Sequence, residues 1–218
     1  VAKFLRQAGV MFSQTYMEAA LVKNAPLAVL LVELFHALHD PRTLESLERR
    51  AETATQIREK IETGLNDVPS ADEDRIIRSF AGVIDATLRT NFFQASDPAE
   101  TKPLLALKLD SGKLDVLPAP KPFVEIFVYS PQLEGVHLRF GPIARGGIRW
   151  SDRAEDFRTE ILGLVKAQQV KNAVIVPVGA KGGFYPKYLP VGGSREEIQS
   201  AAIDAYKNFI ATLLAVTD

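Results

Sequence analysis

The chain has 218 residues, of which 46% are hydrophobic and 24% charged, and its formal net charge is −1. This length suffices for one large domain or two small ones with a buried core, and the near-neutral charge gives no indication of binding to nucleic acid or an anionic membrane. The absence of cysteine excludes disulfides, thiolate metal sites and cysteine nucleophiles. Only three histidines occur, and because none has a ligand-like spacing, no metal site is predicted.

No targeting or membrane segment is expected. The longest apolar run, residues 26–38, contains Glu33 and is shorter than the ~20 residues that a membrane-spanning helix needs. The first residues lack the basic segment and cleavage site of a signal peptide. We therefore expect a cytoplasmic protein. Because the sequence begins without methionine and stops directly after a helical pattern, we interpret it as a segment of a longer chain.

Residues 1–100 are expected to form a helical segment. Pro26 stands where one helix can begin, and Asp40-Pro41 is expected to begin another as an N-cap followed by proline. The apolar stripe of that second helix is predicted to contain Leu44, Leu47, Ala51, Ala54, Ile61 and Leu65.

A capping box at Ser70 to Glu73 is expected to begin the next helix. Its apolar face is predicted to contain Ile76, Ile77, Phe80, Val83, Ile84 and Leu88. No residue pattern in this half indicates chemistry. We interpret it as a scaffold that packs against the rest, with a docking or regulatory module as the alternative.

Residues 101–218 predict an α/β domain with a mixed sheet. Strands are expected at 104–109 and 113–117, joined by a hairpin turn at Asp110-Ser111-Gly112, and again at 123–129, 136–140 and 173–178. A helix is expected at about 152–172, with Asp152 and Glu155 as a capping pair, and a final helix after the capping box Ser194 to Glu197.

Positive charge concentrates in the second half. Residues 139–187 contain nine Lys or Arg against four Asp or Glu. A cationic cluster among glycines and apolar residues indicates a site for an anionic small molecule, whereas the plainer interpretation is a solvated basic face.

Three elements within residues 141–184 carry the candidate chemistry. Arg145 stands beside Gly146 and Gly147, where a backbone without side chains can approach a ligand and the guanidinium can bind a carboxylate, although this stretch also fits a simple turn. Gln168 and Lys171 lie three residues apart and so share one helical face.

The third element is the loop expected at residues 177–184, which places Lys181 before Gly182 and Gly183. Strand ends are common positions for sites in α/β folds, and a lysine with a lowered pKa can act as a base. The loop lacks P-loop spacing, although a different phosphate-binding loop remains an alternative.

The order of these motifs resembles one family. Arg-Gly-Gly-Ile-Arg-Trp (145–150), Gln-Gln-Val-Lys-Asn-Ala (168–173) and Pro-Val-Gly-Ala-Lys-Gly-Gly (177–183) are similar to the substrate domain of glutamate dehydrogenases. Residues 150–158 resemble specifically the large bacterial NAD-dependent branch. The resemblance implies a fragment that holds the substrate-binding part of the catalytic region. The change of residue pattern near residue 100 divides the chain into a helical segment at 1–100 and an α/β domain at 101–218, and the resemblance implies that the second is the glutamate-binding domain.

The resemblance also implies roles for individual residues. Lys181 matches the catalytic lysine, which assists attack of water on the iminium. Lys171 matches the lysine that binds the α-carboxylate, and Gln168 matches a glutamine that helps there. Arg145 stands where hexameric enzymes carry the lysine that binds the γ-carboxylate. The pocket-shaping glycines of the family correspond to Gly146, Gly147, Gly182 and Gly183.

The same resemblance implies oxidative deamination of L-glutamate to 2-oxoglutarate and ammonia. NAD would be the cofactor of the full-length enzyme, and the parent enzyme would be a homo-oligomer. The sequence contains no G-x-G-x-x-G, so we expect the NAD-binding domain to be missing, no cofactor to bind to this part, and the part to be inactive alone. The alternatives are a non-catalytic module that binds small acids or phosphorylated ligands, and a structural fragment whose cations only form ion pairs.

Overall fold

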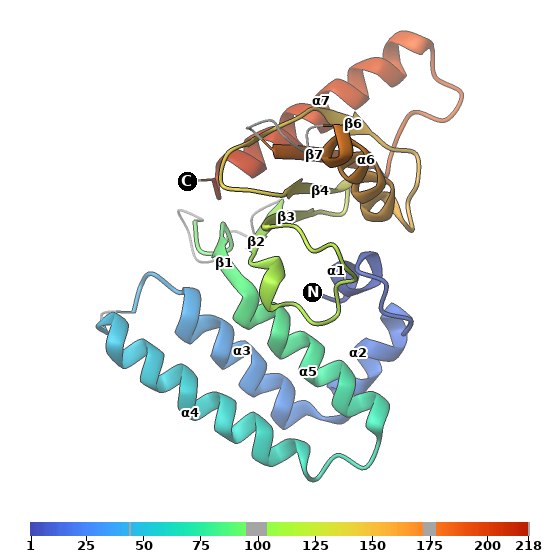
Figure 1. Ribbon diagram of the computed structural model, residues 1–218. Coiled ribbons are helices and arrows are strands. Elements are labelled where there is room, and N and C mark those ends of the chain that lie inside the picture. Colours follow the sequence, from blue (N-terminus) through green and yellow to red (C-terminus); the bar gives the residue numbers. More distant parts are fainter. Residues whose placement is uncertain (44, 95–103, 172–177, 218) are drawn as a thin grey trace. The chain divides into compact units, whose positions relative to one another are not determined.

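The computed structural model describes residues 1–43, 45–94, 104–171 and 178–217 (Figure 1). The chain divides into two compact units, Val1–Ala86 and Thr87–Asp218. The first unit is helical and the second combines a mixed sheet with helices. This confirms the predicted fold class.

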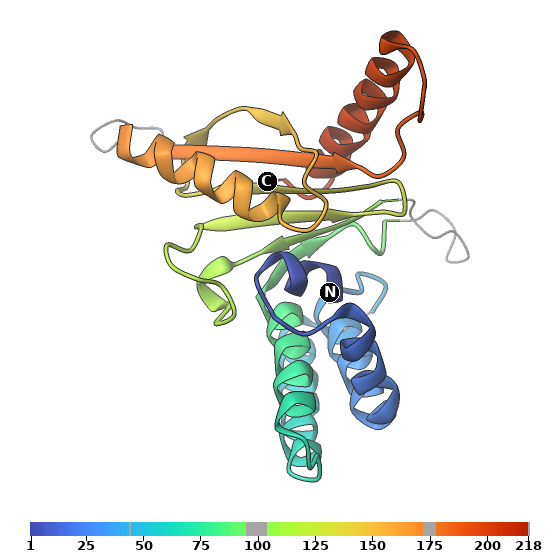
Figure 2. The same ribbon diagram turned by 90° about the vertical axis from the view of Figure 1, so that its right-hand side faces the viewer.

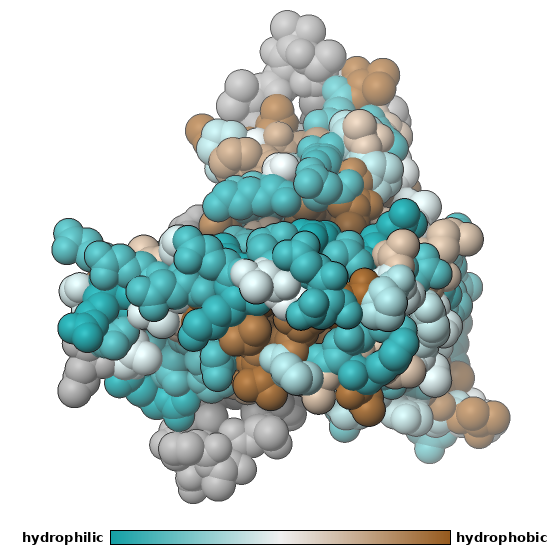
Figure 3. Space-filling view, turned by 90° about the horizontal axis from the view of Figure 1, so that it is seen from below, coloured by the Kyte–Doolittle hydropathy of each residue, from teal (hydrophilic) through white to brown (hydrophobic). Residues whose placement is uncertain are grey.

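The helical unit is built from amphipathic helices whose apolar faces meet. Helix α3 packs against both α4 and α5, and α2 packs against α3 and α5. The helices are α1 (Ala2–Gln7), α2 (Gln14–Lys23), α3 (Ala25–His39), α4 (Leu47–Leu65) and α5 (Ala71–Ala86). The face seen in Figure 3 is largely hydrophilic, with a group of apolar residues among the polar ones. Within the described residues no single helix is long and apolar enough to cross a membrane, and α2 and α3, which pass that test together, are bent by 101° at their junction.

The predicted start of a helix at Asp40-Pro41 is wrong. Asp40 instead follows the end of α3, and its carboxylate accepts hydrogen bonds from the backbone N–H of Arg42 at 3.0 Å and from its guanidinium at 2.8 and 2.7 Å. These hydrogen bonds hold the pKa of Asp40 well below its usual range. Helix α4 begins at Leu47, because Ser46 caps it by accepting from the N–H of Arg49 at 3.3 Å.

The predicted apolar stripe of α4 is correct only in its second half. Leu47 is 81% exposed, and Ala51 is also exposed, whereas Ala54, Ile61 and Leu65 are buried. The predicted member at position 44 lies outside the described residues.

Of the two hydrogen bonds of the capping box predicted at Ser70, the structure shows the one that the serine side chain accepts. Ser70 accepts from the N–H of Glu73 at 3.4 Å, but the Glu73 carboxylate accepts from Lys23 at 2.7 Å and from Asn24 at 2.9 Å. Leu88, predicted on the face of α5, lies instead in the strand that follows and is 45% exposed.

Among the described residues of the second unit, seven strands form one mixed sheet in the order β1-β2-β3-β4-β7-β5, with β6 also paired to β7. Neighbours from β1 to β7 are antiparallel, while β5 and β6 run parallel to β7. The strands are β1 (Thr87–Thr90), β2 (Leu105–Leu109), β3 (Val124–Tyr129), β4 (Leu133–Arg139), β5 (Ala144–Arg145), β6 (Ile148–Trp150) and β7 (Val178–Pro186). The helices are α6 (Phe157–Lys171) and α7 (Arg195–Leu214), with a short 3-10 helix η1 (Ser111–Lys113).

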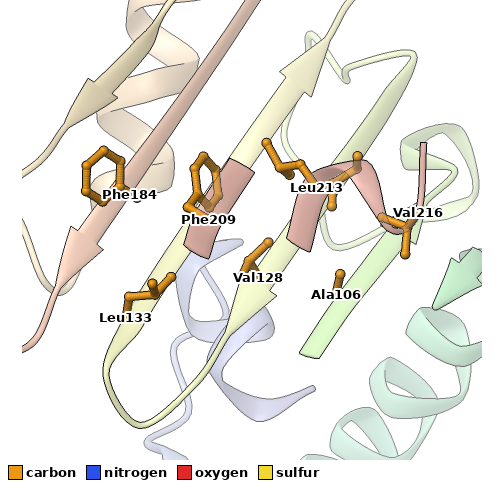
Figure 4. Close-up of a cluster of buried hydrophobic side chains, with 8 residues drawn as sticks. Ala106, Val128, Leu133, Phe184, Phe209, Leu213 and Val216 are labelled. Atoms are coloured by element: carbon orange, nitrogen blue, oxygen red, sulfur yellow. The ribbon is translucent and has the colours of Figure 1, made fainter. Parts of the chain in front are cut away.

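Helix α7 packs on one face of this sheet. Phe209, Leu213 and Val216 meet an apolar group of Ala106, Ile126, Val128, Leu133 and Phe184 (Figure 4). Gly135 lies under Phe209, and a Cβ at that glycine would be only 2.4 Å from the ring. The capping box predicted at Ser194 is confirmed, with reciprocal hydrogen bonds to Glu197 of 3.2 and 2.7 Å.

Helix α6 runs along β7 (Figure 2), and the face that it covers contains a buried ion pair. Arg158 of α6 donates to Glu125 of β3 at 3.1 and 2.6 Å, and Ser111 donates to the same carboxylate at 3.3 Å. Arg158 is 2% exposed, and Glu125 and Ser111 are fully buried. Because removing one charge of a buried pair is costly, this network fixes α6 to the sheet.

Three predictions for this unit are wrong. Residues 113–117 form no strand, because both edges of β2 are already paired, with β1 and with β3. Helix α6 begins at Phe157, so Asp152 and Glu155 do not cap it. Residues 178–184, predicted as part of a loop, belong to β7, because β4 on one side and β5 and β6 on the other supply hydrogen-bonding partners. The strand predicted at 173–178 lies, except for its last residue, outside the described residues.

Candidate functional site

Lys181 lies in the middle of β7, opposite Leu138 of β4. Side chains alternate along a strand, so Lys181 shares its face with Gly179 and Gly183. A Cβ on either glycine would press against α6, at 3.1 Å from Gln168 and 2.3 Å from Ile161. Lys181 therefore projects from the α6 face of the sheet, between two glycines at which the helix lies directly against the strand.

The Gly146–Gly147 segment borders Lys181 along the edge of β7. It connects β5 and β6, and the carbonyl of Gly147 accepts from the N–H of Gly182 at 3.1 Å. A Cβ on Gly146 would lie 1.5 Å from the carbonyl oxygen of Ala180, so only glycine fits there. A Cβ on Gly147 would lie 3.9 Å from the Lys181 amine. The two glycines thus bring backbone to the lysine without a side chain between them.

Arg145 and Gln168 meet at one end of this segment. Arg145 pairs with Gly179 in the parallel ladder, and its side chain is exposed. Its carbonyl accepts from the Gln168 amide at 3.2 Å. The Oε1 atom of Gln168 is buried without a hydrogen-bond partner in the described structure. Gln168 therefore binds the backbone of the segment and leaves one acceptor for a further donor.

The predicted site also includes Lys171, Gly182 and Gly183. Lys171 is the last residue of α6, and its side chain lies outside the described part of the structure. Gly182 faces away from α6, and a Cβ there would lie 2.5 Å from Ile148 and 3.1 Å from the ring of His137. Gly182 and Gly183 therefore permit close packing on opposite faces of β7.

A second contact between α6 and this edge was not predicted from the sequence. The carboxylate of Glu160 accepts from Arg149 at 2.5 Å and from the hydroxyl of Ser151 at 2.6 Å. One feature of the sequence could have indicated this contact. Glu160 stands in the first turn of a helix, shortly after the sequence Arg149-Trp150-Ser151. In the sequence alone, Glu160 is one of four acids among the nine cations of residues 139–187.

His137 on β4 lies near the candidate site, and its pKa is shifted. Burial of its imidazole, and secondarily the charge of Arg139, lower the pKa of His137 from its ordinary value. Because His137 pairs with Gly182, this neutral ring lies on the face opposite Lys181.

A groove of about 750 Å³ lies beside α7, between that helix and the ends of β6 and β7. Its lining is mostly apolar and includes Trp150, Phe184, Ile198, Ile203 and Tyr206. None of the predicted site residues lines it. Within the described ranges, no group of three or more His, Asp or Glu could hold a metal ion.

The α/β fold of the second unit is consistent with a dehydrogenase catalytic domain. Residues 60–218 match the family model described as bacterial NAD-glutamate dehydrogenase, catalytic domain, and residues 1–41 match the model described as glutamate dehydrogenase, helical motif 3. The chain therefore belongs to the bacterial NAD-glutamate dehydrogenase family.

Curated relatives of this family match the whole chain. It is 50% identical to an NAD-specific glutamate dehydrogenase of Pseudomonas aeruginosa, 51% identical to one of Mycobacterium tuberculosis and 49% identical to one of Halomonas elongata, each match covering 100% of the chain. The chain spans only 13–14% of the length of these relatives.

Proposed function

We propose that this chain supplies the glutamate-binding part of an NAD-dependent glutamate dehydrogenase, and that Lys181 is its proton-transfer residue. The observation that carries the proposal is the position of Lys181, whose amine lies beside the Gly146–Gly147 backbone in a catalytic-domain match of this family. The reaction would be oxidative deamination of L-glutamate to 2-oxoglutarate and ammonia.

Substrate binding would use charge at both ends of the dicarboxylate. Arg145 leaves β5 next to Gly146 with an exposed guanidinium, which suits a bidentate contact with one carboxylate. Lys171 is proposed for the other carboxylate on sequence grounds. Two fixed ends would orient the α-carbon, and the amine of Lys181 would then take part in proton transfer.

NAD does not fit the residues of this chain. The sequence contains no G-x-G-x-x-G, so no strand-to-helix turn carries the fingerprint that binds a dinucleotide phosphate. We therefore assign NAD to another part of the enzyme, and no step here depends on it. We propose that this chain alone is inactive and that the complete enzyme is a homo-oligomer.

Two experiments test the proposal. First, the chain is titrated with 2-oxoglutarate and separately with NAD by calorimetry. We expect saturable binding of the dicarboxylate and none of NAD, whereas binding of NAD alone would contradict the proposed division of roles.

Second, Lys181→Ala is introduced into a full-length enzyme that contains this chain, with Lys207→Ala as the matched control. Lys207 is an exposed lysine on α7. Loss of a proton-transfer group is expected to lower kcat by about 100-fold or more, while the control retains full turnover. Equal turnover of both variants, with dicarboxylate binding intact, would favour a non-catalytic module that binds small acids.

A further inference from the structure

Glu160 joins helix α6 to the end of strand β6. Its two carboxylate oxygens are both engaged, one by the guanidinium of Arg149 and one by the hydroxyl of Ser151. The Glu160 side chain is only 12% exposed, which distinguishes it from the neighbouring Asp156, whose side chain is 44% exposed. Charge-assisted hydrogen bonds are stronger than neutral ones, and here the carboxylate is nearly buried while the Arg149 side chain is 55% exposed.

This bridge has a counterpart on the other side of Lys181. At Gly179, α6 reaches the β5 end of the glycine segment through the hydrogen bond from Gln168 to the carbonyl of Arg145. At Gly183, α6 reaches β6, where Arg149 pairs with that glycine and also binds Glu160. Lys181 lies midway between these two glycines in β7. The helix and the edge segment are thus joined on both sides of the lysine.

Strand β6 depends on this bridge because it is short and lies at the edge of the sheet. It has three residues, and its ladder to β7 is continued by one backbone hydrogen bond at each end: from Ser151 N–H to the carbonyl of Phe184 at 2.9 Å, and from Gly182 N–H to the carbonyl of Gly147 at 3.1 Å. Gly147 directly precedes β6, so a shift of the strand moves the backbone beside the Lys181 amine.

We propose that Glu160 is a positioning residue for the reaction: by holding Arg149 and Ser151 against α6, it fixes the distance between Gly147 and Lys181. This inference rests on the proposed function. Glu160 does not itself touch substrate in this assignment, and it acts through the placement of β6 and Gly147. A displacement of about 1 Å at a reacting group can lower the rate by up to about 100-fold.

The placement of β6 has a spectroscopic reporter that does not depend on catalysis. Trp150 is the only tryptophan of the chain and stands between the two residues that Glu160 binds. We would compare acrylamide quenching and emission maxima of Trp150 in wild type, Glu160→Ala, Glu160→Gln and the control Asp156→Asn. Asp156 forms an exposed ion pair with Arg153 in the same segment. Increased quenching in both Glu160 variants, with the control unchanged, is the expected result.

The kinetic test uses the full-length enzyme with the same substitutions. Glu160→Ala is expected to lower kcat by about 10- to 100-fold with a smaller change in KM, since it displaces the Gly147 backbone beside Lys181 rather than the binding cations. Glu160→Gln keeps the shape of the side chain. If the alanine variant fails to fold, the kcat of the glutamine variant tests whether Glu160 has a positioning role.

The outcomes separate this inference from the proposed function. If Lys181→Ala is inactive while both Glu160 variants match Asp156→Asn in turnover and in Trp150 quenching, Glu160 has no positioning role and the inference is wrong. If Lys181→Ala retains full turnover, the proposed function itself is wrong. Trp150 quenching that changes in the Glu160 variants would then support only the structural bridge.

Discussion

Replacing Glu125 by alanine should destabilise the α/β unit severely. The substitution removes the carboxylate that accepts two hydrogen bonds from Arg158 and one from Ser111, all three side chains being 2% exposed or less. Removing one member of a buried ion pair costs about 3–5 kcal/mol, because the remaining charge stays in the protein interior. With a urea m-value of about 2 kcal/mol/M, the unfolding midpoint would fall by about 2 M.

Trp150 fluorescence is the appropriate assay for Glu125→Ala, because the single tryptophan lies in the unit Thr87–Asp218 and does not report on the helical unit. Asp156→Asn, which breaks an exposed ion pair, is the control and should leave the midpoint unchanged. The double change Glu125→Leu with Arg158→Met removes both charges and should recover most of the lost stability. A midpoint for Glu125→Ala equal to that of the control would refute the assignment of this pair as the anchor of α6.

Three further predictions use the same urea assay on the α/β unit, monitored through Trp150. Gly146→Ala should cost about 3 kcal/mol, because the added methyl group overlaps the backbone of Ala180. Gly163→Ala should instead stabilise by about 0.5–1 kcal/mol, because no atom beyond its chain neighbours and its own helix backbone lies within 4 Å of the new Cβ. Similar midpoints for the two variants would contradict this. The lowered pKa of His137 means that its neutral form stabilises the fold above about pH 6.5 and that this contribution is lost as pH falls below that value, so wild type should lose more stability than His137→Gln between pH 7.5 and 5.5. Parallel pH profiles would exclude that contribution. Phe209→Ala should cost about 3–5 kcal/mol, and a loss below about 1 kcal/mol would show that the cavity collapses.

The sequence predicted elements well where the signal is local. The capping box at Ser194 needs only two residues and their backbone, and it forms as expected. The enrichment of residues 123–129 in β-branched and aromatic residues is equally local, and it placed β3 within one residue. Asp40-Pro41 shows the limit, because a nearby guanidinium competes for the carboxylate that would otherwise cap a helix.

The candidate site was predicted as a set of residues but not as an arrangement. The three glycines that flank Lys181 at positions 179, 182 and 183 indicate a loop by composition. In the sheet they are residues of β7, and their missing side chains admit α6 on one face and Ile148 on the other. That distinction depends on neighbouring strands that are distant in the sequence. Glu160 was missed for the same reason, since its partners lie on another element.

The contacts of α6 with β7 at Gly179 and Gly183 restrict where this region can change in length. Ile161 and Gln168 are separated by seven residues, nearly two full helical turns, so both side chains point at the same strand. One residue inserted between them would rotate Gln168 by about 100° away from Gly179 and break its contact with Arg145. An insertion between Trp150 and Phe157, before the helix begins, would leave that spacing intact. Related enzymes should therefore vary in length before α6 and keep this part of the helix at constant length.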